Sequence, residues 1–183
     1  MHLRPGAPDE VGMSAQRVRH ARQLAAGWVA QGLTSALVIL VARRGVVVLH
    51  EAFGRLTPDD HAPPVQRDTI YPLSSLTKPI TATAAMLLVE DGLLGLHQPV
   101  AEYLPEFRGA GKQEVRVHHL LTHTSGLRDE DVRAHAATKR GVVAIPPPDK
   151  TQHPWINEYL FLGYEAPLWK PPGVEMSYCS YGY

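Results

Sequence analysis

The pattern of apolar and polar positions in the first part of the chain predicts one helix followed by a β-hairpin. Apolar residues recur at helical spacing across 18–29, with Ser14 placed as the N-cap and Gly32 closing the last turn. Two short apolar runs, 36–42 and 46–50, follow with a three-residue turn between them. Because both runs are almost continuously apolar, we expect strands that are buried on both faces.

A second helix is predicted after a polar, proline-rich loop at 57–67. An apolar stripe runs from Ile80 to Leu88, and the helix ends near Gly92. Pro79 has no N–H group to donate to the preceding turn, but the first turn of a helix tolerates this loss.

The rest of the chain is predicted to be helical with long connections. Short helices are expected at 100–104 and 118–122, and an aromatic helix at 155–164. Residues 128–150 are charged and then rich in proline, which is typical of an extended loop.

Composition narrows the class of protein without changing this pattern. The 183 residues contain 18 basic and 18 acidic side chains, so no net field favours nucleic acid or an anionic membrane as a partner. The apolar runs are shorter than the ~18 residues of a membrane span, and the polar start of the chain lacks an apolar signal core. With one cysteine, no disulfide can form within the chain. We therefore expect a soluble, cytoplasmic protein.

The candidate chemistry lies in Ser75-Leu76-Thr77-Lys78, at the start of the second predicted helix. This spacing places a hydroxyl and an ammonium on one helix face, and the helix N-terminus presents amides that can stabilise an oxyanion. A serine hydroxyl needs a base at neutral pH. Lys78 can serve if its pKa is lowered, and a tyrosine held as phenolate beside it is the alternative. The motif by itself is also compatible with a serine that only caps a helix and a solvated lysine.

The surrounding sequence resembles a known superfamily. Four segments carry the resemblance: the nucleophile segment 71–81, the helix segment 87–92, His119-Leu120-Leu121-Thr122-His123-Thr124-Ser125-Gly126-Leu127, and Tyr178-Cys179-Ser180-Tyr181-Gly182-Tyr183. Their order and spacing are similar to those of the serine β-lactamase and penicillin-binding-protein superfamily. The most similar branch contains class C β-lactamases, esterases of β-lactamase fold and D-stereospecific peptidases. The resemblance extends over residues 36–183.

This resemblance implies a role for each of four residues. Ser75 is the acylated nucleophile, Lys78 helps to deprotonate it, and Tyr178 is the general base that returns the proton to the leaving group. Ser180 stands where the family usually has asparagine, as a substrate-binding or supporting side chain. A hydroxyl is shorter than a carboxamide and has one donor instead of two, which favours esters over amides and β-lactams. The resemblance implies no metal and no other cofactor.

The resemblance also implies a partner. The family's third motif, a Lys/His-x-Gly on a strand, supplies a second oxyanion-hole amide, and nothing follows Tyr183 in this sequence. We therefore expect residues 1–183 to be the N-terminal part of one β-lactamase-like domain. In that domain, 9–56 form the helix and hairpin of the sheet region, and 57–183 form the helical region. A C-terminal half or a second chain is expected to complete the fold.

Three other features have simpler interpretations. His119 and His123 lie four residues apart and form a possible metal pair, but no third ligand is near them in the sequence. Cys179 alternates away from Tyr178, which predicts a buried structural thiol. An aromatic group forms either plain core or the wall of a cleft for a hydrophobic acyl or alcohol group. Its members are Trp155, Tyr159, Phe161, Tyr164 and Trp169.

The predicted fold is α/β (α+β), of β-lactamase/transpeptidase type: a mostly antiparallel sheet flanked by helices, plus a helical region that holds 75–180. The predicted function is that of a serine hydrolase, and first of all of a β-lactamase-fold carboxylesterase, which makes an acyl-enzyme from a small-molecule ester or amide. A D-stereospecific peptidase or a β-lactamase is the alternative within the enzyme class. A non-catalytic scaffold of the same fold is the alternative outside it.

Overall fold

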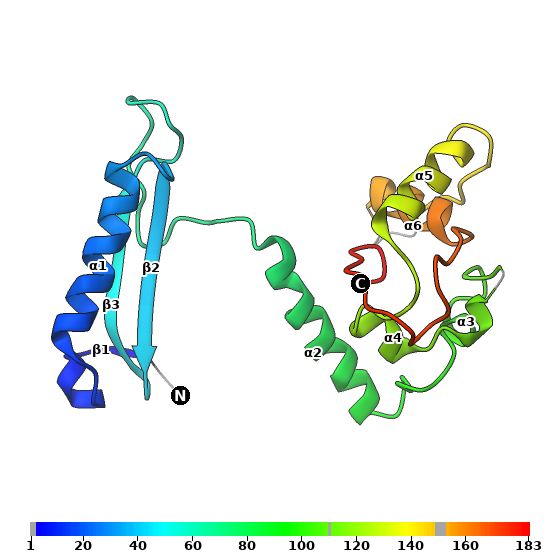
Figure 1. The fold of residues 1–183 in the computed structure, drawn as a ribbon, viewed down its shortest axis with the longest axis horizontal. Coiled ribbons are helices and arrows are strands. Elements are labelled where there is room, and N and C mark those ends of the chain that lie inside the picture. The colour runs from blue at the N-terminus through cyan, green and yellow to red at the C-terminus, as the bar shows by residue number, and fades with distance from the viewer. Residues whose placement is uncertain (1–2, 110, 149–152) are drawn as a thin grey trace. The chain divides into compact units, whose positions relative to one another are not determined.

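The computed structural model describes residues 3–109, 111–148 and 153–183, and the chain forms two compact units (Figure 1). The first unit, Met1–Pro72, holds the sheet, and the second unit, Leu73–Tyr183, holds the helical region. The assignment of both units to one domain stays a prediction.

The sheet unit combines one α-helix with three strands. The strand order is β1-β3-β2, with β2 and β3 antiparallel as expected and β1 parallel to β3. The sequence pattern contains no signal for β1, which is two residues long. The elements are β1 (Arg4–Pro5), the 3-10 turn η1 (Pro8–Val11), α1 (Ala15–Ala30), β2 (Ala36–Arg43) and β3 (Val46–Gly54).

Local sequence explains where these elements begin and turn. The Ser14 hydroxyl accepts a hydrogen bond from the Arg17 N–H at 3.4 Å, so Ser14 caps α1 as predicted. Arg44 and Gly45 have φ angles of 50° and 79°, as a tight hairpin turn requires. The predicted helix and hairpin are therefore confirmed.

The predicted burial of the strands is only partly correct. The helix α1 packs along the hairpin (Figure 1), and Ala25, Val46 and Leu49 are buried. Every residue of β2 is half-buried or exposed, so the prediction of burial on both faces is wrong for this strand. The reason is that α1 is the one α-helix described in this unit, and one helix covers one face of a sheet.

The helical unit is built from short helices joined by loops. The short helices predicted near 100, 118 and 155 are confirmed as α3, α4 and α6. The elements are the 3-10 turn η2 (Ser74–Leu76), α2 (Thr77–Glu90), α3 (Val100–Tyr103), the 3-10 turn η3 (Lys112–Glu114), α4 (Val117–Leu121), α5 (Asp129–Lys139) and α6 (Pro154–Gly163).

The helix α5 corrects the prediction of an extended loop over 128–150. Its first turn consists of three acidic residues, 129–131, which are favourable at the positive end of a helix. Val132 and Ala136 lie four residues apart and are both buried, so one face of α5 packs inward. A two-residue apolar face in a charged segment is too weak a pattern to predict a helix from the sequence.

One hydrophobic core holds the segments from α3 onward together. It joins residues of the short helices to residues near the end of the chain, so distant segments share one packing unit. The buried members are Val100, Phe107, Val115, Val117, Leu127, Val132, Ala166, Cys179 and Tyr181.

A buried lysine belongs to the same region. Lys112 is 1% exposed, and its ammonium donates a hydrogen bond to the Tyr164 carbonyl. The ammonium also lies 4.7 Å from the centre of the Phe107 ring. Burial lowers the pKa of Lys112 to about 8.

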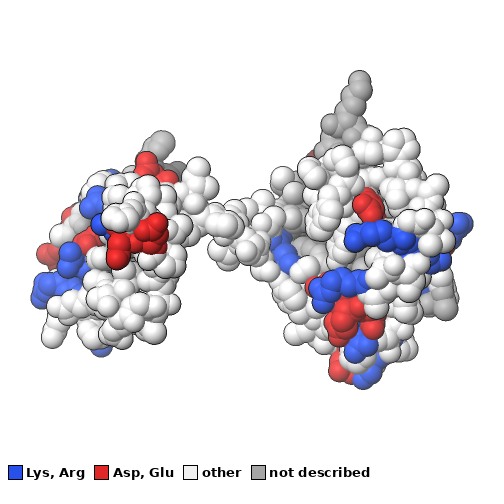
Figure 2. Space-filling model, turned by 90° about the horizontal axis from the view of Figure 1, so that it is seen from above, with Lys and Arg blue, Asp and Glu red and all other residues white. Residues whose placement is uncertain are grey.

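The helix α2 differs from the other long helices because none of its residues is buried. Ile80, Leu87 and Leu88 are 45% or more exposed, although they form its predicted apolar stripe. Across the part of the chain that the structure describes, no helix is both long and apolar enough to cross a membrane. Acidic and basic side chains are interspersed on the face of each unit seen in Figure 2.

Candidate active site

Ser75 lies in a short 3-10 turn that runs directly into α2. Ser74, the residue before it, has a φ angle of 45°, in the left-handed region that non-glycine residues rarely adopt. Because Ser75 lies in the first turn of this helical segment, the N–H groups around it have no intrahelical acceptor and can face a developing oxyanion. Pro79 falls in the first turn of α2, where its missing N–H is tolerated as expected.

The structure brings Ser75, Lys78 and Tyr178 together. The hydroxyls of Ser75 and Tyr178 share a hydrogen bond, in which either oxygen can donate. The Lys78 ammonium donates to the Ser75 Oγ at 3.5 Å and lies 4.8 Å from the centre of the Tyr178 ring. A candidate nucleophile, a candidate base and a lysine ammonium thus meet at one place.

Ser180 completes the group of four predicted residues. Its hydroxyl accepts a hydrogen bond from the Lys78 ammonium at 3.3 Å. Lys78 therefore bridges the nucleophile turn and the loop that carries the tyrosine. The structure places the four side chains close together, as predicted. Their catalytic roles stay predictions.

The electrostatics of this group favour a reactive tyrosine. The Lys78 ammonium, followed by the Ser75 hydroxyl, lowers the pKa of Tyr178 from its usual value. A lower pKa increases the fraction of Tyr178 that is phenolate near neutral pH. Tyr178 is 50% exposed in the described residues.

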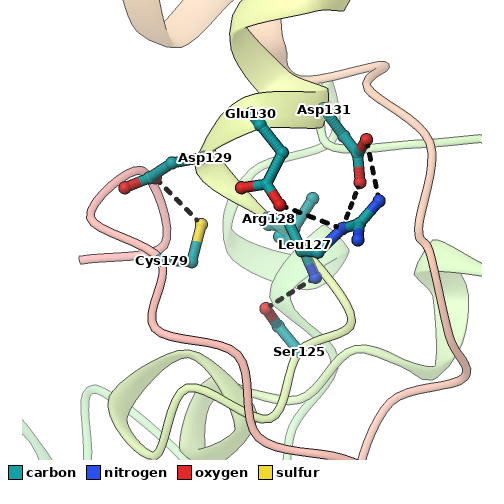
Figure 3. A network of polar contacts seen from close by, with 7 residues as sticks. All are labelled: Ser125, Leu127, Arg128, Asp129, Glu130, Asp131 and Cys179. Carbon is teal, nitrogen blue, oxygen red and sulfur yellow. Dashed lines mark hydrogen bonds and ion pairs between the residues drawn. The ribbon is translucent and has the colours of Figure 1, made fainter.

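Two residues that the sequence reasoning did not assign to the site hold the tyrosine loop. The Asp129 carboxylate accepts hydrogen bonds from the N–H groups of Ser180 and Tyr181, both at 3.0 Å. It also accepts one from the Cys179 thiol at 3.3 Å (Figure 3). His123 accepts the Cys179 N–H through its Nδ1 at 3.2 Å. The signal in the sequence was indirect: His123 lies in a family segment, and Asp129 begins a cluster of acids.

The ionisation states of these two residues suit their roles as acceptors. Burial raises the pKa of Asp129, but the hydrogen bonds from Tyr181, Ser180 and Cys179 outweigh it and leave the pKa lowered. Burial, followed by the Lys78 charge, lowers the pKa of His123. His123 is therefore neutral near pH 7, and its Nδ1 can accept a hydrogen bond from an N–H group. Its ring also lies 4.5 Å from the Tyr178 ring.

The remaining candidate residues from the sequence are held by packing or by hydrogen bonds. Cys179 is 1% exposed, as predicted, and burial raises the pKa of its thiol to about 12. His119 accepts the Arg116 N–H through its Nδ1, and the described residues contain no group of three or more potential metal ligands. Of the aromatic group, Tyr159 packs against the core, whereas Trp155 is 60% exposed and stacks on Tyr159.

A comparison with known protein families identifies the family of this chain. The family model described as "Beta-lactamase" matches residues 19–183. The chain belongs to the beta-lactamase family. Its fold is the α/β fold of β-lactamases and transpeptidases, present in part.

Members of the beta-lactamase family to which the chain is similar are considerably longer. Esterase EstB of Burkholderia gladioli is 45% identical over 94 residues, which cover 49% of this chain and 24% of EstB. The solved structure of EstCE1, a hydrolase with promiscuous acyltransferase activity, matches with a TM-score of 0.71 and 27% identity. That match covers 88% of this chain and 43% of EstCE1.

A third match supports the fold alone. The D-amino acid amidase from Ochrobactrum anthropi SV3 has a TM-score of 0.67 at 23% identity, over 91% of this chain and 42% of the amidase. The chain thus spans less than half the length of each of these three proteins.

Proposed function

We propose that this chain carries the nucleophile and the general base of a serine hydrolase that cleaves carboxylic esters through an acyl-enzyme. The observation that carries the proposal is the hydrogen bond between the Ser75 and Tyr178 hydroxyls beside the Lys78 ammonium. The 45% identity with Esterase EstB over 94 residues supports the same reaction class.

The geometry supports a two-step reaction. The Ser75 Oγ attacks the ester carbonyl carbon while the Tyr178 oxygen takes the hydroxyl proton, and the carbonyl oxygen becomes an oxyanion. The bond to the alcohol then breaks, and Tyr178 returns the proton to the departing oxygen. Water attacks the acyl-enzyme in the same way, which releases the acid and restores the Ser75 hydroxyl.

Lys78 has a supporting part in this reaction. Its ammonium stabilises the phenolate form of Tyr178 electrostatically, and its hydrogen bond to Ser180 fixes its direction. It accepts no proton in this scheme, so the cation persists through both steps.

Esters are the preferred substrates in this proposal because of Ser180. Its hydroxyl accepts from Lys78 and keeps one O–H donor, but it is shorter than a carboxamide and has one donor fewer, so its contact with a substrate amide carbonyl is weaker. The alternative within the enzyme class is cleavage of a D-amino acid amide or a β-lactam, supported by the fold shared with the Ochrobactrum amidase.

A fluorophosphonate probe tests the proposal on the protein at its full encoded length. We expect labelling at Ser75 that disappears in Ser75→Ala and persists in Ser74→Ala, a matched change at the neighbouring serine. Absence of labelling in the wild type would instead favour a non-catalytic scaffold. A panel of p-nitrophenyl esters, D-amino acid amides and cephalosporins then separates the substrate classes.

We also propose that a further segment or a second chain covers α2. The support is the exposure of Ile80, Leu87 and Leu88, together with the greater length of the relatives. Apolar residues on one helix are normally buried against another element. We expect the 183 residues expressed alone to self-associate and to lack esterase activity, with both defects corrected by the longer protein. A monomeric, fully active 183-residue chain would contradict this proposal.

A further inference from the structure

The loop that carries Tyr178 is held by one nearby segment of the chain. The backbone N–H groups of residues 177, 179, 180 and 181 donate hydrogen bonds to acceptors on His123 and Asp129. The Ser177 N–H donates to the His123 carbonyl at 2.9 Å, and the Cys179 N–H donates to the His123 Nδ1 at 3.2 Å. The N–H groups of Ser180 and Tyr181 donate to Asp129.

Among the described residues, the Asp129 side chain accepts more hydrogen bonds from this loop than the His123 side chain does. Its Oδ1 accepts from the Tyr181 N–H and from the Cys179 thiol, and its Oδ2 accepts from the Ser180 N–H. Hydrogen bonds to a charged acceptor stabilise more than those to a neutral one. Asp129 is the first residue of α5, whose buried face fixes it to the core.

These contacts decide which way the loop side chains point. Asp129 holds the Cys179 side chain inward, where it is 1% exposed. Tyr178 and Ser180, on either side of Cys179, are exposed, and both reach the Ser75–Lys78 turn.

We propose that Asp129 is a positioning residue that sets the Tyr178 hydroxyl against Ser75 and Lys78. It acts through the backbone of residues 179–181 and touches neither the substrate nor the reacting atoms. This inference rests on the proposed function, because it assigns Asp129 to the same reaction.

The isosteric substitution Asp129→Asn tests this role. An amide offers one oxygen in place of two, so at least one loop N–H group then faces an NH₂ group. The loop is expected to shift, and a misplacement of about 1 Å lowers kcat by roughly 100-fold while KM stays within about threefold. Tyr178 moves away from Lys78, so the acidic limb of the kcat/KM profile moves to higher pH.

A second measurement reports on Tyr178 without activity. In protein with carbon-13 at the hydroxyl-bearing ring carbon of tyrosine, the Tyr178 signal is assigned by its loss in Tyr178→Phe. We expect it to titrate below the usual ~10 in the wild type and to return toward ~10 in Asp129→Asn. The matched control is Glu130→Gln, which removes the neighbouring negative charge, 63% exposed, and leaves the loop contacts intact.

The outcomes separate this inference from the proposed function. If Asp129→Asn is folded and its Tyr178 titration and pH profile match the wild type, Asp129 has no positioning role, whatever happens to kcat. If the wild type fails to react with the fluorophosphonate but the titration moves, the inference stands and the proposed function fails. If Asp129→Asn does not fold, Asp129→Glu keeps the charge with displaced oxygens, and a smaller shift in the same direction is expected.

Discussion

Ser75 and Tyr178 meet at one hydrogen bond, yet the segments that carry them are held in different ways. The tyrosine loop is fixed by Asp129 and His123 and anchored by Cys179, which belongs to the hydrophobic core. The nucleophile turn leads into α2, a helix without a buried residue. One partner therefore has a built support in this chain, and the other does not.

The two segments differ in the interactions that stabilise their positions. A loop held by several hydrogen bonds to a core element keeps its position without any substrate. A helix joined to its surroundings by exposed hydrogen bonds gains only about 0.5–1.5 kcal/mol from each. If a further segment covers α2 as we propose, the geometry of Ser75 depends on that segment, whereas the geometry of Tyr178 depends on residues already present.

The largest effect is expected from Tyr178→Phe, which removes the proposed base and leaves the support of the loop intact. General-base catalysis contributes about 10²- to 10⁴-fold, so the rate of acylation by a p-nitrophenyl ester should fall by that factor. The control is Tyr183→Phe, since the Tyr183 hydroxyl donates to the Leu121 carbonyl at 2.9 Å and not to Ser75. Equal losses in the two variants would show that Tyr178 only packs beside the nucleophile.

A pair of leucines tests the difference in support directly. Leu127 is 1% exposed in the core, and Leu127→Ala should lower the free energy of unfolding by about 2–5 kcal/mol. Leu87 on α2 is 58% exposed, and Leu87→Ala should change it by no more than about 0.5 kcal/mol in the 183-residue chain, measured at a concentration low enough to keep this chain monomeric. Urea denaturation of both variants measures this contrast.

The same pair gives a different result if α2 is covered in the protein at its full encoded length. There, Leu87→Ala should approach the cost of Leu127→Ala, because the leucine becomes a core residue. A small effect of Leu87→Ala in both lengths of chain would leave α2 without a partner and contradict its proposed coverage.

The sequence predicted the elements whose signals are local. The α1 cap at Ser14 and the turn between the strands depend on neighbouring residues, and the spacing of Ser75 and Lys78 on one turn does too. The meeting of Ser75 with Tyr178, 103 residues apart, was available only through resemblance, since no local rule brings distant segments together.

There is a physical reason why the support of the tyrosine loop could not be predicted from the sequence. Asp129 is the first of three adjacent acids, and nothing in their spacing distinguishes the one that faces the loop. Its role depends on Cys179 pointing inward, which is a property of packing. The helix α5 was missed on the same grounds, because Val132 and Ala136 provide only a short buried face.

The pH dependence of stability that comes from Lys112 tests the core that supports the tyrosine loop. Its pKa is lowered from 10.5 to about 8, so the unfolded chain binds its proton more tightly than the native one. The stabilisation linked to Lys112 is therefore fully present above 10.5 and is lost as the pH falls through about 8, a change of roughly 3 kcal/mol.

The comparison for this prediction is Lys112→Met, which removes the titrating group. Cys179 and Tyr181 titrate at high pH in both proteins, so only the difference between wild type and variant is used. The wild type should gain stability relative to Lys112→Met between pH 8 and 10.5 in urea denaturation. Parallel pH profiles would show that Lys112 keeps an ordinary pKa in the core.

The smallest effect is expected at Ser180, where the supported loop meets Lys78. In Ser180→Asn, the amide oxygen can still accept from the Lys78 ammonium, and the NH₂ group becomes a new donor toward the substrate. One added hydrogen bond of about 1 kcal/mol corresponds to roughly a fivefold gain in kcat/KM for amides or β-lactams, with esters nearly unchanged. Ser180→Ala is the control, because it removes the acceptor for Lys78 and should slow both substrate classes. A gain for esters equal to that for amides would mean that residue 180 acts through Lys78 alone, and that substrate preference is set elsewhere in the site.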